Sequence, residues 1–333
     1  MARTKLQLQR FWFQSGFFLL FILAPPLDLL RYDLTQGHFF FLGMNWTLGI
    51  DGLISGEISP LEAAMNIIFI GFLPIALTAA GLIWIAWKFG RLYCGWLCPH
   101  FSVVEMINKL MIRASGKHSI WEKKPIPELQ ADGSYIKPDK RFWLVTVLAA
   151  LFFAFIWALS FLTYLLPPFE IYSNLINWEL TGNQARFLGV GTLLLFIEFM
   201  FARHLFCRFG CAVGLFQSLA WMGNNRALVV GFDKQQANLC SSCNNACDNI
   251  CPMRLKPRTI KRKMFTCTEC AQCISACEQV QAAQPSAPLS WVTDADAIVV
   301  ATDKPAKSTD PKQSCTALNE PCSAQRPCQE TGG

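Results

Sequence analysis

Four apolar runs of about 20 residues constrain this chain more than any other feature of its sequence. They lie at about 11–30, 66–88, 142–166 and 187–206, and each is rich in Phe, Leu and Ile. A helix of about 20 apolar residues spans the hydrocarbon core of a bilayer, which is roughly 30 Å thick. One such run also fits a buried core helix, whereas four predict a polytopic, mainly α-helical membrane bundle.

The composition agrees with a chain that has lipid around much of its surface. Hydrophobic residues make up 53% of its 333 residues and charged residues only 16%, against about 25% charged in a typical soluble domain. Tryptophans lie near several run ends, as interfacial anchors do, at Trp12, Trp84, Trp87 and Trp143. The net charge of +6 is modest, so a nucleic-acid partner is not expected.

The first run also has an alternative interpretation as a secretory signal peptide, because it follows Arg3, Lys5 and Arg10. A small-residue cleavage pattern is missing, and Pro25 and Pro26 follow Ala24 directly. We therefore expect an uncleaved anchor. The apolar run at 38–50 is too short to span a bilayer, and we expect it to lie at the outer face or to re-enter the membrane.

Lysine and arginine counts near the run ends predict the orientation. The N-terminal end and the 91–141 loop are rich in basic residues, whereas the segment between the first two runs and the one between the last two are mainly acidic. The prediction is a multi-pass protein of the bacterial inner (cytoplasmic) membrane, surrounded by membrane lipid, with its N- and C-termini on the cytoplasmic side.

Two cysteine motifs between residues 239 and 280 carry the clearest chemistry. They are Cys240-x2-Cys243-x3-Cys247-x3-Cys251-Pro252 and Cys267-x2-Cys270-x2-Cys273-x3-Cys277. The bacterial ferredoxin run is C-x2-C-x2-C-x3-C-P, and its fourth cysteine ligates the other cluster of a two-cluster domain. The second motif has this cysteine spacing with Glu278 in place of the proline, while the first keeps the proline and has one extra residue before Cys247.

We therefore predict two [4Fe–4S] clusters with exchanged fourth ligands. Cluster 1 is assigned to Cys240, Cys243, Cys247 and Cys277, and cluster 2 to Cys267, Cys270, Cys273 and Cys251. Segments this short bury too little apolar surface to fold without their metal. The alternative is structural zinc, which also uses paired C-x2-C motifs, and a disulfide scaffold is disfavoured on the cytoplasmic side.

A basic stretch joins the two motifs. It contains no acidic residue between its first and last cation, and consists of Arg254, Lys256, Arg258, Lys261, Arg262 and Lys263. It is either a docking patch for an acidic redox partner or for anionic headgroups, or a solvated linker that obeys the positive-inside rule.

Two further cysteine pairs follow apolar runs and form an internal repeat. Cys94 and Cys98 follow the second run, Cys207 and Cys211 follow the fourth, and the pairs lie 113 positions apart. Residues i and i+4 share one face of a helix, so the two pairs together would offer four thiols. These four could be redox thiols or the ligands of a third metal site; small residues that close a turn are the alternative.

These motifs together resemble the membrane polyferredoxins, the NapH-like, NosR-like and CcoG-like accessory proteins of bacterial respiratory reductases and oxidases. The resemblance rests on CGWLCP after one run, a second C-x3-C after another, and the two ferredoxin motifs with CPM, over about residues 66–280. It implies cytoplasmic [4Fe–4S] clusters on the eight cysteines assigned above, and the NapH-like architecture is nearest. Ala212 stands where the family usually has proline.

The predicted organisation is therefore a transmembrane domain over 1–236, a bis-[4Fe–4S] ferredoxin-type domain over 237–285 and a disordered tail over 286–333. The tail is polar apart from residues 297–301, and its Cys315, Cys322 and Cys328 show no ligand spacing that we recognise. They are expected to be free thiols, with capture of a soft ion such as Cu(I) as the alternative.

No run has a central histidine pair for haem, and no G-x-G-x-x-G motif is present for a nucleotide. Three functions stay open. The first is an iron–sulfur electron-transfer component that passes electrons between a quinol or a cytoplasmic donor and a respiratory reductase. The second is a cupric reductase or metal-cofactor maturation factor for a respiratory oxidase. The third is a non-redox structural or sensing protein.

Overall fold

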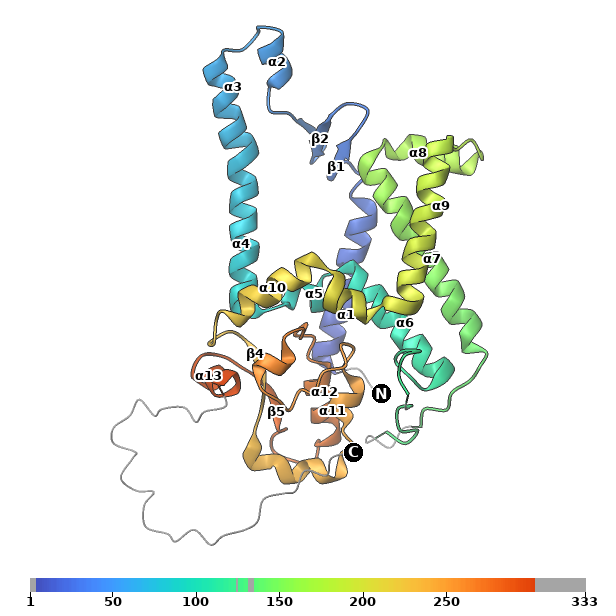
Figure 1. The fold of residues 1–333 in the computed structure, drawn as a ribbon, viewed down its shortest axis with the longest axis vertical. Helices are drawn as coiled ribbons and strands as arrows, with labels where there is room; N and C mark the ends of the chain where they lie inside the picture. Colours follow the sequence, from blue (N-terminus) through green and yellow to red (C-terminus); the bar gives the residue numbers. More distant parts are fainter. Residues whose placement is uncertain (1–3, 124, 131–134, 303–333) are drawn as a thin grey trace, which may run out of the picture.

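The computed structural model describes residues 4–123, 125–130 and 135–302. Upright helices form its upper part in Figure 1, and a small domain that carries the ferredoxin motifs lies below them. Short helices that run across the view separate the two parts (Figure 1).

Within the described residues, three helices are long and apolar enough to cross a membrane. The first runs over Pro60–Phe89 and combines α3 (Pro60–Asn66), η1 (Ile67–Phe72) and α4 (Leu73–Phe89). The second is α7 (Phe142–Leu165), and the third joins α9 (Gly182–Ile197) to η2 (Glu198–Ala202). They correspond to the last three of the four predicted runs.

The first predicted run is helical only as part of α1 (Lys5–Leu23), which is not among these three helices. Pro25 and Pro26 follow Ala24 directly, and neither has the backbone N–H that would continue the helical hydrogen bonds. The apolar half of α1 packs along α7, since the Phe21 and Trp157 rings lie 4.6 Å apart and the Tyr164 hydroxyl donates to the Phe21 carbonyl at 3.0 Å. The count of four spans therefore stays a prediction.

The three long helices differ in how far their own chain covers them. None of the most apolar window of Pro60–Phe89 is buried, against 33% for α7 and 17% for Gly182–Ala202. The buried face of α7 packs on α6 (Pro99–Ser115), with Ala150, Ala154 and Trp157 against Val104 and Ile107. The exposed apolar faces are what a lipid environment requires.

Small elements close the end of the helices opposite the ferredoxin motifs (Figure 1). β1 (Leu30–Asp33), β2 (His38–Phe41) and β3 (Met44–Trp46) form an antiparallel sheet, with Arg31 opposite Phe40 and Phe39 opposite Trp46. α2 (Ile50–Ile54) and α8 (Pro168–Ile176) complete this end. The short apolar run at 38–50 thus contributes two strands and lies at this end of the helices.

Short elements cross beneath the long helices. They are α5 (Leu92–Trp96), α6, η3 (Phe206–Gly210) and α10 (Ala212–Met222), and they follow the second and fourth apolar runs directly. This layer contains both C-x3-C pairs and lies between the membrane helices and the lower domain.

The lower domain is built from two strands and short helical segments. β4 (Val229–Phe232) pairs antiparallel with β5 (Leu289–Val292), and α11 (Ala246–Ile250) packs against α12 (Gln272–Val280). η4 (Lys234–Ser242), η5 (Lys261–Met264) and α13 (Asp294–Thr302) complete the domain.

Its boundaries differ from the predicted 237–285. The tail predicted from residue 286 is ordered over β5 and α13, because Leu289 and Ala297 are buried and β5 pairs with β4. The apolar residues 297–301 lie within α13. The rest of the predicted tail, with Cys315, Cys322 and Cys328, lies outside the described residues.

Candidate metal centres

Twelve cysteines lie in the described residues, all free, and each lines one of three cavities. Site 1 is formed by Cys240, Cys243, Cys247 and Cys277, around about 310 Å³ of space between protein atoms. Site 2 is formed by Cys251, Cys267, Cys270 and Cys273, around about 400 Å³. The membrane-exit site is formed by Cys94, Cys98, Cys207 and Cys211, around about 1280 Å³ including its open mouth.

Sites 1 and 2 each take their fourth cysteine from the other motif. Cys277 follows the second motif along the chain but lines the cavity of Cys240, Cys243 and Cys247. Cys251 in turn lines the cavity of the second motif. These are the two groups of four that the sequence predicts, and the exchange places α11 and α12 side by side.

Local backbone geometry explains how two motifs of different spacing form similar loops. The residue before each short helix, Asn245 before α11 and Ala271 before α12, has a positive φ of 54°. Each loop also has a second left-handed residue, Asn244 in the first and Glu269 in the second, and asparagine adopts this conformation more readily than most residues. The two loops therefore share this backbone feature despite the extra residue before Cys247.

The membrane-exit site joins the two halves of the repeat. Cys94 lies in α5 and Cys207 in η3, whereas Cys98 and Cys211 are the N-cap residues of α6 and α10. The interpretation of each pair as i and i+4 on one helix is therefore wrong, since a helix break separates the two cysteines. The Cys211 sulfur accepts a hydrogen bond from the Gly214 amide at 3.4 Å, as the exposed N–H groups of a helix N-terminus allow.

Buried arginine and glycine contacts hold this site together. Arg91, 1% exposed, donates to the carbonyls of Cys207 at 2.8 Å and of Thr266 at 3.5 Å, and so links both repeats and the lower domain. A Cβ atom on Gly214 would lie 1.7 Å from an Arg91 nitrogen, and one on Gly95 would lie 2.1 Å from the Thr268 carbonyl oxygen. Both glycines are required by close packing.

Burial dominates the electrostatics of the cysteines. It raises the pKa of Cys94 to about 12, of Cys247 to about 12 and of Cys251 to about 11. It also holds the pKa of Cys207, Cys267 and Cys273 well above the usual value. Thiol–disulfide chemistry relies on accessible thiolates with lowered pKa, which these buried groups do not offer. A bound metal would displace the protons instead.

The donor sets fit a cluster better than a single ion. In the described part of the chain, no three His, Cys, Asp or Glu side chains lie close enough to hold one metal ion. Tetrahedral zinc needs four sulfurs at about 2.3 Å from one centre. Four thiols around a cavity, each available to a different iron, match the ligand set of a [4Fe–4S] cluster.

The three sites form a continuous series. Cys98 and Cys207 of the membrane-exit site pack against the same buried cluster as Cys251 and Cys267 of site 2. Cys267 and Cys273 of site 2 in turn share a core with Cys247 and Cys277 of site 1. Site 2 is therefore in the middle, between the membrane-facing layer and the far part of the lower domain.

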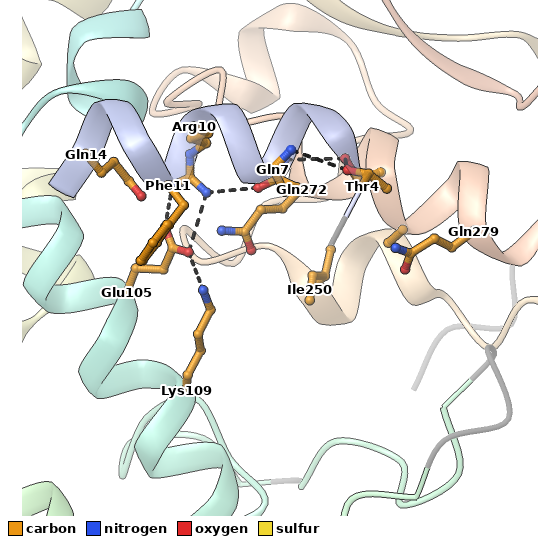
Figure 2. A pocket seen from close by; sticks show the side chains of 12 residues that line it. Thr4, Gln7, Arg10, Phe11, Gln14, Glu105, Lys109, Ile250, Gln272 and Gln279 are labelled. Carbon is orange, nitrogen blue, oxygen red and sulfur yellow. Dashed lines mark hydrogen bonds and ion pairs between the residues drawn. The ribbon is translucent and has the colours of Figure 1, made fainter. Parts of the chain in front are cut away.

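A buried ion pair fixes α1 beside this series. Arg10, 2% exposed, pairs with Glu105 of α6 and donates to the Gly95 carbonyl at 2.7 Å. Figure 2 shows Arg10 and Lys109 both directed at the Glu105 carboxylate. Burial alone would raise the pKa of Glu105, but Arg10 and Lys109 hold it at about 2. The carboxylate therefore stays charged and joins α1 to α6.

The polar wall in Figure 2 continues from this pair to the lower domain. Gln7 donates to the Cys270 carbonyl at 3.1 Å, and the Thr4 hydroxyl donates to that of Ser275 at 3.0 Å. The N-terminal helix thus contacts both the membrane-exit layer and site 2.

Only three of the six basic residues in the predicted docking patch are exposed. Arg254 pairs with Glu122, Arg258 pairs with Asp248, and Lys261 is buried with its amine on the Trp221 and Asn224 carbonyls. Only Lys256, Arg262 and Lys263 are exposed. Burial lowers the pKa of Lys261 to about 8, so this residue supports the fold and does not offer a docking charge.

Sequence reasoning missed the buried charges Arg10 and Glu105 and the partly buried charge of Glu198. Glu198 lies inside the fourth apolar run, and His100 Nε2 lies 2.8 Å from its Oε2. A charged residue within a membrane run is uncommon and usually functional, so its position in the run was a usable signal. The partner of each charge comes from a distant segment, which the sequence does not identify.

The comparison with protein families points to the cysteines of the membrane-exit site. A family described as a 4Fe-4S binding domain matches residues 70–118 and 183–227. These stretches contain the two C-x3-C pairs and end before Cys240. The match therefore falls on the two halves of the internal repeat and leaves the ferredoxin motifs outside it.

Three curated proteins are similar at low identity. The Escherichia coli protein named "Putative electron transport protein YccM" is 22% identical over 68% of this chain and 56% of its own length. Two uncharacterized Methanocaldococcus jannaschii proteins, MJ0750 and MJ0749, are 26% and 25% identical over 57% of this chain, and the matches cover 70% and 62% of their lengths. The chain thus spans only about half of the first relative. No solved structure matches.

These matches support an iron–sulfur electron-transfer family with [4Fe–4S] binding. Three helices suited to a bilayer indicate association with a membrane.

Proposed function

We propose that this protein is a membrane-anchored electron-transfer component with three [4Fe–4S] clusters, at sites 1 and 2 and at the membrane-exit site. The observation that carries the proposal is the unbroken series of three cysteine quartets, from the layer under the membrane helices to the far part of the lower domain. When bound, such clusters accept and release single electrons.

The membrane-exit quartet is proposed as metal ligands in preference to redox thiols. Its cysteines come from the two stretches that match a 4Fe-4S binding family, and burial raises the pKa of Cys94 and Cys207. The chain offers compensating charge, since Arg91 is fully buried against this layer. A cluster with four thiolates is an anion, and a buried anion needs such a partner.

The membrane arrangement is proposed to be four spans, with α1 as the first, and both termini on the cytoplasmic side. α1 lies along α7 over its apolar half and places Arg10 at the level of Gly95. The basic loop 91–141 and the lower domain then share the cytoplasmic side, as the positive-inside rule favours.

Electrons are proposed to pass between a quinol or a cytoplasmic donor and a respiratory reductase partner, in the NapH-like manner. Site 1 is the natural contact for a soluble partner, because Cys240 and Cys277 are half-buried while the cysteines of site 2 are almost all buried. The exposed Lys256, Arg262 and Lys263 lie in the same domain and favour an acidic partner.

Iron analysis of anaerobically purified protein tests the proposal. Three clusters predict about twelve irons and as many acid-labile sulfides per chain. Cys94→Ala should reduce the iron to about eight while the EPR signals of the two ferredoxin-type clusters remain. Cys315→Ala, in a tail cysteine with no ligand spacing, is the control and should keep all of the iron.

If the wild-type protein contains about eight irons per chain, the membrane-exit site does not hold a third cluster. The quartet would then be thiols, and reduction of Cu(II) by the purified protein would become the reaction to measure. Stoichiometric zinc with little iron would overturn the electron-transfer function altogether.

A further inference from the structure

The membrane-exit cavity is larger than its four cysteines require. Without the open solvent at its mouth it holds about 580 Å³, against about 20 and 10 Å³ at sites 2 and 1, where four cysteines also form the lining. A cluster of the same kind would therefore leave several hundred Å³ free. Ligand pockets of proteins commonly occupy about 300–1,000 Å³, so a second group fits beside the cluster.

The free part of the cavity has an apolar mouth on the flank of the helices. Phe161 of α7 and Leu194 of α9 line it from above, and Phe206 and Val213 line it from the layer below. These four side chains are between 39% and 62% exposed. Because α7 and α9 are candidate membrane helices, this mouth faces the hydrocarbon, and an apolar molecule can enter it from the bilayer.

The otherwise apolar wall of the cavity contains one carboxylate, that of Glu198. Glu198 belongs to the candidate span Gly182–Ala202, and its Oε2 lies 2.8 Å from His100 Nε2. Its other oxygen, Oε1, is buried and has no hydrogen-bond partner in the part of the chain that the structure describes. An unsatisfied carboxylate oxygen in a membrane segment is costly, and this one is available to accept a further hydrogen bond.

We propose that this cavity binds the ring of an isoprenoid quinol, with Glu198 Oε1 accepting a hydrogen bond from one quinol hydroxyl. Such a molecule has a hydroxyl donor for the carboxylate, a flat ring for the aromatic wall of Trp157 and Phe161, and an apolar tail for the mouth. The inference rests on the proposed electron-transfer function, and it places the quinol next to the membrane-exit cysteines.

A phospholipid acyl chain would satisfy the apolar mouth but offers no donor to Glu198. It is therefore the competing occupant that the experiment has to exclude. The chain supplies a matched pair of variants, because Leu193 and Leu194 are neighbours on α9 with similar exposure, 57% and 62%, and only Leu194 lines the cavity.

The experiment is photolabelling of the iron-loaded protein in detergent with a short-chain azidobenzoquinone in its reduced form. Label is expected on peptides that contain residues 157–161 and 194–198, and excess unlabelled quinol should compete it away. Leu194→Trp should abolish the label by filling the mouth, whereas Leu193→Trp should keep it. Glu198→Leu should weaken binding about tenfold, the effect of one lost hydrogen bond to a charged group.

Equal labelling of the two tryptophan variants, or label that phospholipid displaces as well as quinol does, would overturn the inference. Iron content and the EPR spectrum of each sample are measured alongside. Full iron without specific labelling rejects the quinol site alone. A missing third cluster rejects the proposed cofactor set, whatever the labelling shows.

Discussion

Sites 1 and 2 and the membrane-exit site each have four cysteines, but the chain assembles them in different ways. The eight cysteines of sites 1 and 2 lie within 38 consecutive residues, on loops and short helices of five and nine residues. The membrane-exit site joins pairs that lie 113 positions apart, at the ends of long helices. The first region is a local fold, whereas the second is a contact between distant parts of the chain.

This difference indicates what holds each region in place. Short segments with cysteines in their core depend on metal ligation for folding. The membrane-exit cysteines are instead held by the packing of α6 on α7, by Arg91 and by the Arg10–Glu105 pair. Loss of metal should therefore disturb sites 1 and 2 more than the membrane-exit site. Point substitutions in the packing contacts should disturb the membrane-exit site more.

Removal of iron should have the largest effect, and it should be confined to the lower domain. Chelation under oxidising conditions is expected to open residues 234–285 to protease while α7 and α9 stay protected, because their burial does not depend on a cluster. Mass spectrometry of limited digests measures this. Cleavage first in the 91–115 segment would show that both regions depend equally on metal.

Glu105→Gln should act on the membrane-exit region. It leaves Arg10 buried without its counter-charge, and breaking a buried pair in this way costs about 3–5 kcal/mol. We expect lower thermal stability and loss of the third cluster, with the ferredoxin-type EPR signals retained. Lys109→Gln is the control, since the Lys109 side chain is 59% exposed and should contribute less than about 1 kcal/mol.

The same pair predicts a pH dependence. The pKa of Glu105 falls from 4.5 to about 2 in the folded protein, so the stability it adds is complete above pH 4.5 and is lost as the pH falls toward 2. Glu105→Gln should lack this part of the acid transition in thermal unfolding curves. Identical acid transitions in the variant and the wild type would contradict the assigned role of the pair.

Gly95→Ala should disturb the contact between the membrane-exit region and the lower domain. The new Cβ would lie 2.1 Å from the Thr268 carbonyl oxygen, and overpacking of this kind costs about 1–3 kcal/mol. Gly81→Ala in α4, with no atom within 4 Å of the new Cβ, should be neutral or slightly stabilising. Comparable unfolding temperatures for the two variants would show that α5 does not dock tightly on site 2.

Lys263→Glu should have the smallest effect, on partner association alone. Lys263 is exposed and belongs to the reduced basic patch, so reversal of its charge should slow association with an acidic partner several-fold at low salt and little at high salt. Stopped-flow reduction of the clusters by an acidic ferredoxin measures this, with Lys137→Glu in the 91–141 loop as the control. Salt-independent rates would remove the patch as a docking surface.

The sequence predicted the local features well because their causes are local. Ligand spacing predicted two quartets whose members line the cavities of sites 1 and 2, although their role as cluster ligands stays a prediction, and run length located three of the long helices. The break between Cys94 and Cys98 was missed, although Pro99 follows at the first position of α6, where proline is favoured. The sequence did not predict that β5 is an ordered strand, because its partner, β4, lies about 60 residues earlier.

Contacts between distant segments escaped prediction for a different reason. Apolar patterning identifies a helix but does not identify its neighbour, so the pairing of Arg10 with Glu105 and of Glu198 with His100 had no signal along the chain. The same limit applied to the basic stretch, where ion pairs and burial remove three of six cations from the surface.

The hydrogen bonds from the N-terminal helix to the lower domain have a consequence for biosynthesis. Thr4 and Gln7 bond to Ser275 and Cys270, residues that leave the ribosome more than 260 positions later. α1 therefore remains in or near the membrane without these two partners until almost the whole chain has been made, since domains form during synthesis from the N-terminus onward. Closure of α1 onto site 2 is then a late step, and cluster insertion has the interval before it in which the cysteines are accessible.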